Sequence, residues 1–389
     1  MSTQNRQSPA FIGAGLACHL GTSVSACIDG LFRPPQPPQL FDLEIGGRPE
    51  RVPYKLMAGA SPGASPERLY RVLERVICEA VDEAGLSPQE LHRAWLFIGS
   101  SSFDICVSEQ EYRHDLARGE AAPLPLRDAS YASLAEWIRS RFSLRGEDFS
   151  FNTACTASAN ALWYASRAIE AGWTHHALVI GVELMNNITA QGFHGLGLLT
   201  RSVMKPFDRD RDGLVLGEAC GAIILGPARR AGTFHLRAGA NLCDAHSMSA
   251  ANPDGSTIAA VIGQALDAAK LSPDDVTAIK AHGTASLMND EAEAAGMLAA
   301  FKRLPAVCAL KPFIGHTLGA GGIAELILLC KSIERGTLPG TPGIGADSSV
   351  LGVALTQAPR PVRPGNFLLN YFGFGGSNTS LVVANGDAA

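Results

Sequence analysis

Short apolar runs alternate along this chain with longer segments in which apolar residues recur at helical spacing. The apolar runs, which we expect to form strands, are residues 10–16, 95–98, 149–151, 177–182, 276–281, 307–310 and 367–370, of which residues 10–16 and 177–182 are expected to be buried and residues 149–151 to be a strand end. The expected helices are residues 69–84, 157–171, 258–269, 290–300 and 319–333. Strands that alternate with helices in this way predict an α/β fold with buried sheets.

Two segments do not follow this alternation. Residues 31–66 are rich in proline and are expected to form a loop. Residues 106–128 are polar and are expected to form a loop and a helix on the surface. The strand–helix order restarts after residue 230, so we expect two similar halves, residues 1–230 and residues 231–389.

Composition and charge narrow the class of protein. The 389 residues are 46% hydrophobic and 18% charged, which is the composition of a globular enzyme. A net charge of −5 argues against nucleic-acid binding, because nucleic-acid binders usually carry a basic excess. The first residues lack the pattern of a secretory signal, and no apolar run reaches membrane-spanning length. We therefore expect a cytoplasmic enzyme with reduced thiols and no membrane partner.

Cys155 is placed where a cysteine can act as a nucleophile. It lies between the expected strand that ends at residue 151 and the expected helix that begins at residue 157. The free N–H groups and the dipole at a helix N-terminus favour a thiolate, so they lower the pKa of a cysteine placed there. Position alone leaves a buried structural cysteine as an equal alternative.

Two histidines follow expected strands in tight glycine contexts. His282 lies in the sequence Ala-His-Gly-Thr, and His316 lies in Gly-His-Thr. A cysteine with distant histidine partners is a known arrangement for nucleophilic catalysis, although a lone histidine is more often a core residue. Metal binding is the competing interpretation. It is disfavoured because none of these motifs has the spacing of paired ligands.

Six sequence blocks, taken in order, resemble the β-ketoacyl-acyl-carrier-protein synthases of types I and II, members of the thiolase superfamily. The blocks are residues 11–15 (FIGAG), 152–158 (NTACTAS), 205–213 (KPFDRDRDG), 282–284 (HGT), 311–316 (KPFIGH) and 370–378 (NYFGFGGSN). The resemblance covers nearly the whole chain. It implies a thiolase-like α/β fold, in which two similar βαβ-rich halves form five layers in the order αβαβα. The N-terminal half would carry the nucleophile and the C-terminal half the two histidine motifs.

The resemblance implies a reaction and roles for the three central residues. Cys155 would receive an acyl group from a carrier-protein phosphopantetheine thioester. His282 and His316 would flank a malonyl group and promote its decarboxylation by stabilising the enolate that forms. The product would be a 3-oxoacyl carrier protein, made by decarboxylative Claisen condensation with malonyl carrier protein. The resemblance implies no metal and no cofactor beyond the phosphopantetheine of the carrier.

Further matching positions would support these three residues. The backbone N–H groups of Cys155 and Phe374 would form an oxyanion hole, and Phe374 would also gate the acyl pocket. Lys311 and Glu325 would be a buried charged pair that holds the histidines. The hydroxyls of Thr284 and Ser286 would bind the pantetheine amides.

Alternatives within this resemblance remain open. Because Cys155 and both histidines are present, we expect an active elongating enzyme, not a chain-length factor or a thiolase that works on CoA thioesters. Residues 100–104 are polar where the family often has a Gly- and Ile-rich segment at the end of the acyl pocket. That difference favours a specialised pathway, of polyketide or aryl-polyene type, over ordinary fatty-acid elongation.

The expected partners are an acyl carrier protein and a second subunit. The resemblance implies a homodimer, with a heterodimer containing a chain-length-factor-like protein as the alternative. Carrier proteins are acidic, so a basic rim near the tunnel is expected. Candidates for that rim are Arg68, Arg71, Arg201 and Lys205.

Overall fold

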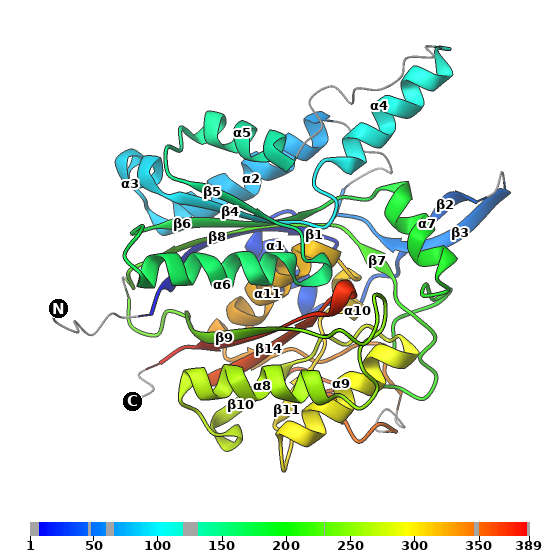
Figure 1. The fold of residues 1–389 in the computed structure, drawn as a ribbon, viewed down its shortest axis with the longest axis vertical. Coiled ribbons are helices and arrows are strands. Elements are labelled where there is room, and N and C mark those ends of the chain that lie inside the picture. The colour runs from blue at the N-terminus through cyan, green and yellow to red at the C-terminus, as the bar shows by residue number, and fades with distance from the viewer. Residues whose placement is uncertain are drawn as a thin grey trace.

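The computed structural model describes residues 8–45, 48–59, 66–119, 131–228, 230–345 and 350–386. Figure 1 shows five layers, in which helices and sheets alternate. The outer helices of the first half are α2 (Pro66–Ala84), α3 (Pro88–Arg93) and α5 (Tyr131–Phe142). The central helices are α1 (Val24–Leu31), α6 (Ala157–Glu170) and α11 (Gly321–Glu334). The outer helices of the second half are α8 (Ser256–Ala269) and α9 (Leu287–Ala300). This arrangement confirms the αβαβα order that the sequence led us to expect.

The two sheets have the same strand order and the same strand directions. The first runs β5 (Asp148–Phe151), β4 (Trp95–Gly99), β6 (Ala177–Glu183), β8 (Ala219–Gly226) and β1 (Ala10–Cys18). The second runs β11 (Ala306–Cys308), β10 (Val276–Lys280), β14 (Asn366–Phe372), β15 (Ser377–Ala384) and β9 (His235–Cys243). In both sheets the first three strands are parallel to one another. The fourth and fifth strands each pair antiparallel with the strand before them.

The sheets are joined at one point, where Ala10 of β1 pairs with His235 of β9. The ten strands therefore form one hydrogen-bonded sheet that is folded into two five-stranded halves. The predicted boundary between residues 230 and 231 falls between β8 and β9. The division of the chain at that boundary remains a prediction.

Helices α6 and α11 bring two distant segments together in the middle layer. Gly322 makes this possible, because a Cβ atom there would lie 2.2 Å from the backbone N of Ala159. The N–H of Ile323 also donates to the Ser158 hydroxyl at 3.1 Å. The close approach joins the first turns of the two helices, one just after Cys155 and the other just after His316.

The expectation of a loop over residues 31–66 is wrong in its centre. Strands β2 (Gln39–Ile45) and β3 (Arg48–Lys55) form an antiparallel hairpin there, and β3 pairs with β7 (Leu216–Gly217). The last four residues of β3, from Val52 to Lys55, are all buried, and Leu43 of β2 is fully buried, which gives these strands their stability. Residues 60–65 of this segment lie outside the described residues.

The expected surface helix of residues 106–128 is α4 (Ile105–Ala117), which projects from the body in Figure 1. Residues 120–128 lie outside the described part of the chain. Among the helices that the structure describes, none is long and apolar enough to span a bilayer.

Candidate active site

Cys155 lies in a one-turn 3-10 helix, η1 (Ala154–Thr156), that leads directly into α6. The turn is sharp, because Ala154 has a φ of +50° in the left-handed region that side chains other than glycine seldom adopt. The thiol is buried, with 6% of the residue exposed. Cys155 thus lies between strand β5 and helix α6, in the strand–turn–helix setting that the sequence predicts.

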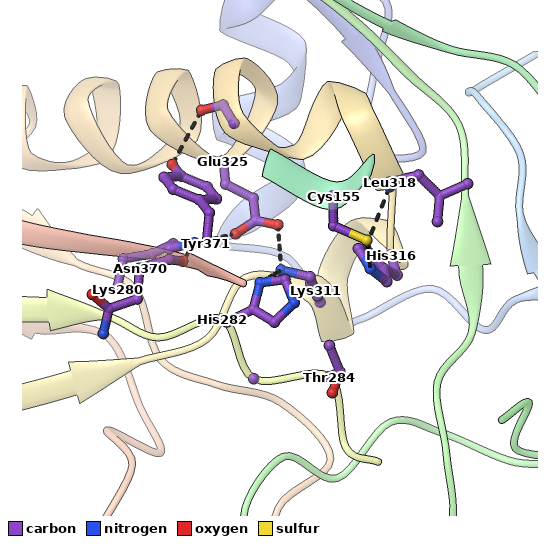
Figure 2. A network of polar contacts seen from close by, with 12 residues as sticks. Cys155, Lys280, His282, Thr284, Lys311, His316, Leu318, Glu325, Asn370 and Tyr371 are labelled. Carbon is purple, nitrogen blue, oxygen red and sulfur yellow. Dashed lines mark hydrogen bonds and ion pairs between the residues drawn. The ribbon is translucent and has the colours of Figure 1, made fainter. Parts of the chain in front are cut away.

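His316 is the immediate partner of the thiol. Its Nε2 lies 3.1 Å from Sγ of Cys155 (Figure 2). The backbone N–H of Leu318 donates to Nδ1 of the same ring at 3.3 Å. A neutral imidazole carries one proton, so a ring whose Nδ1 accepts must donate from Nε2. His316 is thereby held as an N–H donor to the sulfur.

His282 is held in the same tautomer by a different contact. Its Nδ1 lies 3.3 Å from Nζ of Lys311, and an ammonium group can only donate. Nε2 of His282 therefore carries the ring proton. The ring centroids of His282 and His316 are 5.5 Å apart, and the rings are nearly perpendicular. The site thus holds two imidazole N–H donors beside one thiol.

The backbone at His282 is fixed by two buried carboxylates of α9. The side chain of Glu293 accepts from the N–H groups of His282 and Gly283, at 2.7 and 2.8 Å. Asp290 accepts from the N–H groups of Thr284 and Ala285, both at 3.1 Å. Our sequence reasoning did not identify either carboxylate.

The expected Lys311–Glu325 pair is part of a triad, because Glu325 binds a second lysine. Lys311 donates to one oxygen of Glu325 at 2.8 Å and Lys280 to the other at 2.7 Å (Figure 2). Lys280 also donates to the carbonyl of Asn370 at 2.7 Å, and its Nζ lies 3.6 Å from the ring centroid of Tyr371. All three charged side chains are fully buried or nearly so, and within the triad the two ammonium groups outnumber the one carboxylate.

Burial and the charge of Lys311 keep both histidines neutral. Burial lowers the pKa of His282 and of His316 well below the usual value of 6.5, and Lys311 lowers both further. Burial also lowers the pKa of Lys280 to about 8, although Glu325 opposes that shift. The imidazoles therefore act as neutral hydrogen-bond donors and not as cations.

The expectation that the helix N-terminus lowers the pKa of Cys155 is wrong in its net result. Burial raises the pKa of the Cys155 thiol to about 12. Lys311 and the backbone N–H groups of Phe374 and Cys155 act in the opposite direction but do not outweigh it. The reason is that a buried thiolate loses its hydration, and the short helix end does not replace it.

Phe374, which lines the same pocket as Cys155, comes from a glycine-rich turn, η4 (Phe374–Gly376). Gly376 needs its positive φ of +76°, and a Cβ atom there would lie 1.9 Å from the carbonyl oxygen of Asp244. The ring of Phe374 stacks on Phe193 with 5.5 Å between centroids. Phe193 belongs to α7 (Asn187–Gly195) and also meets the ring of His316 edge-on. Our sequence reasoning did not identify Phe193.

One pocket collects most of the predicted site residues. Its lining includes Cys155, His282, His316, Thr284, Ser286, Phe374 and Phe193. The hydroxyls of Thr284 and Ser286 are 3.0 Å apart. Lys311 and Glu325 do not line the pocket but lie behind His282. The arrangement offers a nucleophile, two N–H donors and backbone N–H groups to one bound group.

Comparison with known families agrees with this geometry. The model of the β-ketoacyl synthase N-terminal domain matches residues 61–231, and the model of the β-ketoacyl synthase C-terminal domain matches residues 235–344. The chain belongs to the β-ketoacyl synthase family. This membership places it in the thiolase superfamily, among acyltransferase-type condensing enzymes.

Among curated relatives, this β-ketoacyl synthase is similar to the spectinabilin polyketide synthase system protein NorA' of Streptomyces orinoci. The two are 32% identical over 343 residues, which are 82% of this chain but 9% of the relative. It is also 30% identical over 348 residues to the polyketide synthase GfsE of Streptomyces halstedii, covering 82% of this chain and 9% of that protein. The chain therefore spans less than a tenth of the length of these two relatives.

Among solved structures, the ishigamide ketosynthase/chain length factor aligns with a TM-score of 0.85 at 26% identity, over 97% of this chain and 99% of that chain. The β-ketoacyl synthase fold described above is thus shared along nearly the full length.

Two segments that the sequence singled out have buried structural roles in this β-ketoacyl synthase. The hydroxyls of Ser101 and Ser102 both donate to the buried Glu183, which also accepts from the N–H of Gly319 at 3.1 Å. The polarity of Ser101 and Ser102 is therefore used to anchor the segment. Both guanidinium NH₂ groups of Arg68 donate to Glu218, at 2.8 and 2.5 Å, so Arg68 is not a free docking residue.

Among the residues that the structure describes, no group of three or more His, Cys, Asp or Glu side chains could hold a metal ion.

Proposed function

We propose that this chain is a 3-oxoacyl-acyl-carrier-protein synthase that uses Cys155 as its acyl-carrying nucleophile. The observation that carries the proposal is the contact between Sγ of Cys155 and Nε2 of His316, with His282 held in the same tautomer beside it. A nucleophile with two neutral N–H donors suits a reaction in which an enolate must be stabilised next to an acyl thioester.

The first step would be acyl transfer. The Cys155 thiol loses its proton to solvent water, and the thiolate is stabilised by the N–H of His316 and the charge of Lys311. The thiolate attacks the carbonyl carbon of the acyl carrier protein. The tetrahedral oxyanion accepts from the N–H groups of Cys155 and Phe374. The C–S bond to the carrier then breaks, and the carrier thiolate takes up one proton.

The second step would be decarboxylative condensation. The thioester carbonyl of malonyl carrier protein accepts hydrogen bonds from Nε2 of His282 and of His316. Carbon dioxide leaves, and the electron pair of the broken C–C bond forms an enolate that the two N–H donors stabilise. The enolate carbon attacks the acyl carbonyl on Cys155. The Cys155 thiolate leaves and regains a proton.

The carrier would reach the site through the pocket lined by Thr284 and Ser286. We retain the proposal that their hydroxyls bind the pantetheine amides, because both residues are buried and line the pocket beside the thiol. Arg71, Arg201 and Lys205 remain proposed docking residues for an acidic carrier, and Arg201 has 88% of its side chain exposed.

A specialised pathway is the second part of the proposal. Its support is the similarity to polyketide synthase proteins, since the polarity of Ser101 and Ser102 is accounted for by their bonds to Glu183. A cytoplasmic location, which the sequence led us to expect, also stays a prediction.

A second subunit is proposed to bind at β5, the outer strand of the first sheet. Three large aromatic side chains are exposed beside it, namely Phe149 (41%), Tyr164 (54%) and Trp173 (69%). A homodimer is our default. The similarity to the ishigamide ketosynthase/chain length factor favours the alternative, a heterodimer in which this chain has little activity alone.

The test is to incubate the purified chain with an acyl carrier protein and to measure its intact mass. We expect an acyl adduct on Cys155 that a Cys155→Ala change abolishes. Malonyl carrier protein is then added, and we expect a 3-oxoacyl carrier protein. An adduct without product would support the heterodimer, and absence of the adduct would contradict the proposal.

A further inference from the structure

A second cavity of about 280 Å³ shares no lining residue with the pocket of Cys155. One wall is formed by the prolines of residues 35–38. The others include Val203, Met204, Val215 and Pro312. Lys55, the last residue of β3, is the one charged side chain among the described residues that line it.

Lys55 is buried without a counter-charge from the described residues. The residue is 5% exposed, and its Nζ donates to the carbonyl of Gln36 at 2.5 Å. No carboxylate in the described ranges forms an ion pair with it. An ammonium group has three donors, so two remain for another acceptor. A buried charge of this kind normally has an ionic partner, because its desolvation is otherwise uncompensated.

We propose that this cavity binds an amphipathic monocarboxylate about the size of octanoate, with its carboxylate on the Lys55 ammonium and its tail against Val203, Met204 and the prolines. One cation matches one carboxylate, whereas a phosphate site gathers several charged or backbone donors. The volume lies just under the usual range for small-molecule pockets, roughly 300–1,000 Å³. The apolar remainder of the lining suits a hydrocarbon tail.

The ionisation of the neighbouring groups is consistent with this site. Burial lowers the pKa of Lys55 to about 8, so the side chain is mostly charged at neutral pH. His19 is the neighbouring titratable side chain whose charge would oppose an ammonium there. Burial and Lys55 both lower the pKa of His19, which keeps it neutral.

The cavity also borders the backbone that positions the active site. The N–H of His316 donates to the carbonyl of Val215 at 2.7 Å, and Pro312 directly follows Lys311. A monocarboxylate bound in the cavity would therefore lie against Val215 and Pro312, in the segments that hold His316 and Lys311. The binding itself does not depend on the proposed condensation.

The test uses octanoate labelled with carbon-13 at its carboxyl group, observed by NMR with the full chain. Wild type is compared with Lys55→Met, which keeps the length of the side chain and removes its charge, and with Val203→Phe, which fills the rim. The Cys155→Ala variant identifies any octanoate bound in the active-site pocket. Octan-1-ol and inorganic phosphate are the control ligands, and thermal unfolding shows that each variant is folded.

We expect saturable octanoate binding by wild type and by Cys155→Ala. The dissociation constant should rise at least roughly tenfold in Lys55→Met and should also rise in Val203→Phe. Octanol and phosphate should bind more weakly than octanoate. The proposal is overturned if octanoate does not bind, if Lys55→Met binds it equally well, if Cys155→Ala abolishes binding, or if either control ligand binds as tightly.

Discussion

The ammonium group of Lys311 lies 3.3 Å from Nδ1 of His282 and thereby determines which nitrogen of that ring is protonated. Glu325 holds Lys311 in this position through a 2.8 Å contact. The N–H of Leu318 has the same effect on His316. Both rings therefore present Nε2–H to the pocket, and this shared tautomer explains how two neutral histidines can stabilise an enolate.

Replacing Lys311 by Met should impair decarboxylation more than acylation. Without the ammonium, His282 is free to carry its proton on Nδ1 and ceases to donate from Nε2. Loss of one such donor typically costs about 10²–10³ in rate. Decarboxylation of malonyl carrier protein and acylation of Cys155 are measured separately. Lys331→Met on the same helix as Glu325 is the control, and equal loss of both steps in Lys311→Met would refute the assignment.

Deprotonation of Lys280 should make the free energy of unfolding increase as the pH rises above 8. The usual lysine pKa of 10.5 applies in the unfolded chain, whereas burial holds the pKa of Lys280 at about 8 in the folded protein. Between these values the unfolded state binds more protons, so the free energy of unfolding increases with pH. Below pH 8 Lys280 is protonated in both the folded and the unfolded state, so the free-energy cost of burying its charge is fully present.

A comparison of wild type with Lys280→Met by denaturant unfolding from pH 7 to 10.5 tests this effect. Wild type should gain up to ~3 kcal/mol relative to the variant across that window. Lys55 is present in both proteins, so its contribution cancels. Parallel stability curves would show that Lys280 is not the source of a pH dependence.

His316 should lower the pKa of Cys155. A hydrogen bond to a charged group contributes about 1.5–3 kcal/mol, so His316→Ala should lower the thiolate population of Cys155, and with it the alkylation rate at one fixed pH, roughly 10- to 100-fold. The rate is measured with iodoacetamide, followed at Cys155 by peptide mass spectrometry. The exposed Cys243 in the same sample serves as the internal control. An alkylation rate at Cys155 that stays constant or rises would contradict the donor role inferred for His316.

Phe193 should restrict access to Cys155 through its stacking on Phe374. An aromatic pair contributes about 0.5–1.5 kcal/mol beyond its buried area, so Phe193→Ala should increase the open population roughly 2- to 10-fold. The rate of N-ethylmaleimide addition to Cys155 at one pH reports this population. Phe193→Leu keeps much of the bulk of the side chain without the stacking, so its rate of addition should lie between those of wild type and Phe193→Ala. No acceleration in Phe193→Ala would exclude a gating role.

Much of the fold was predictable from local patterns. The apolar runs became the strands β1, β4, β6, β10 and β14, because each is short and buried on both faces. The hairpin of β2 and β3 was missed because the prolines of residues 34–38 precede it and obscured its alternation.

The chemistry of the site was predictable only in part. Motifs identified Cys155, His282 and His316, but the net pKa shift of Cys155 depends on burial, which no local pattern reports. Lys280 was missed because its contact with Glu325 depends on how β10 packs against α11. A signal for it existed, since a lysine within a buried apolar strand requires a partner.

The central claim is that decarboxylation at the two histidines is coupled to removal of the acyl group from Cys155. The most direct test is a single-turnover reaction of isolated acyl enzyme with malonyl carrier protein that is radiolabelled in its free carboxyl group. The account predicts one labelled carbon dioxide released for each acyl group lost from Cys155, with both processes at the same rate. Carbon dioxide released while the acyl group stays on Cys155, or an acyl group lost without carbon dioxide, would contradict it.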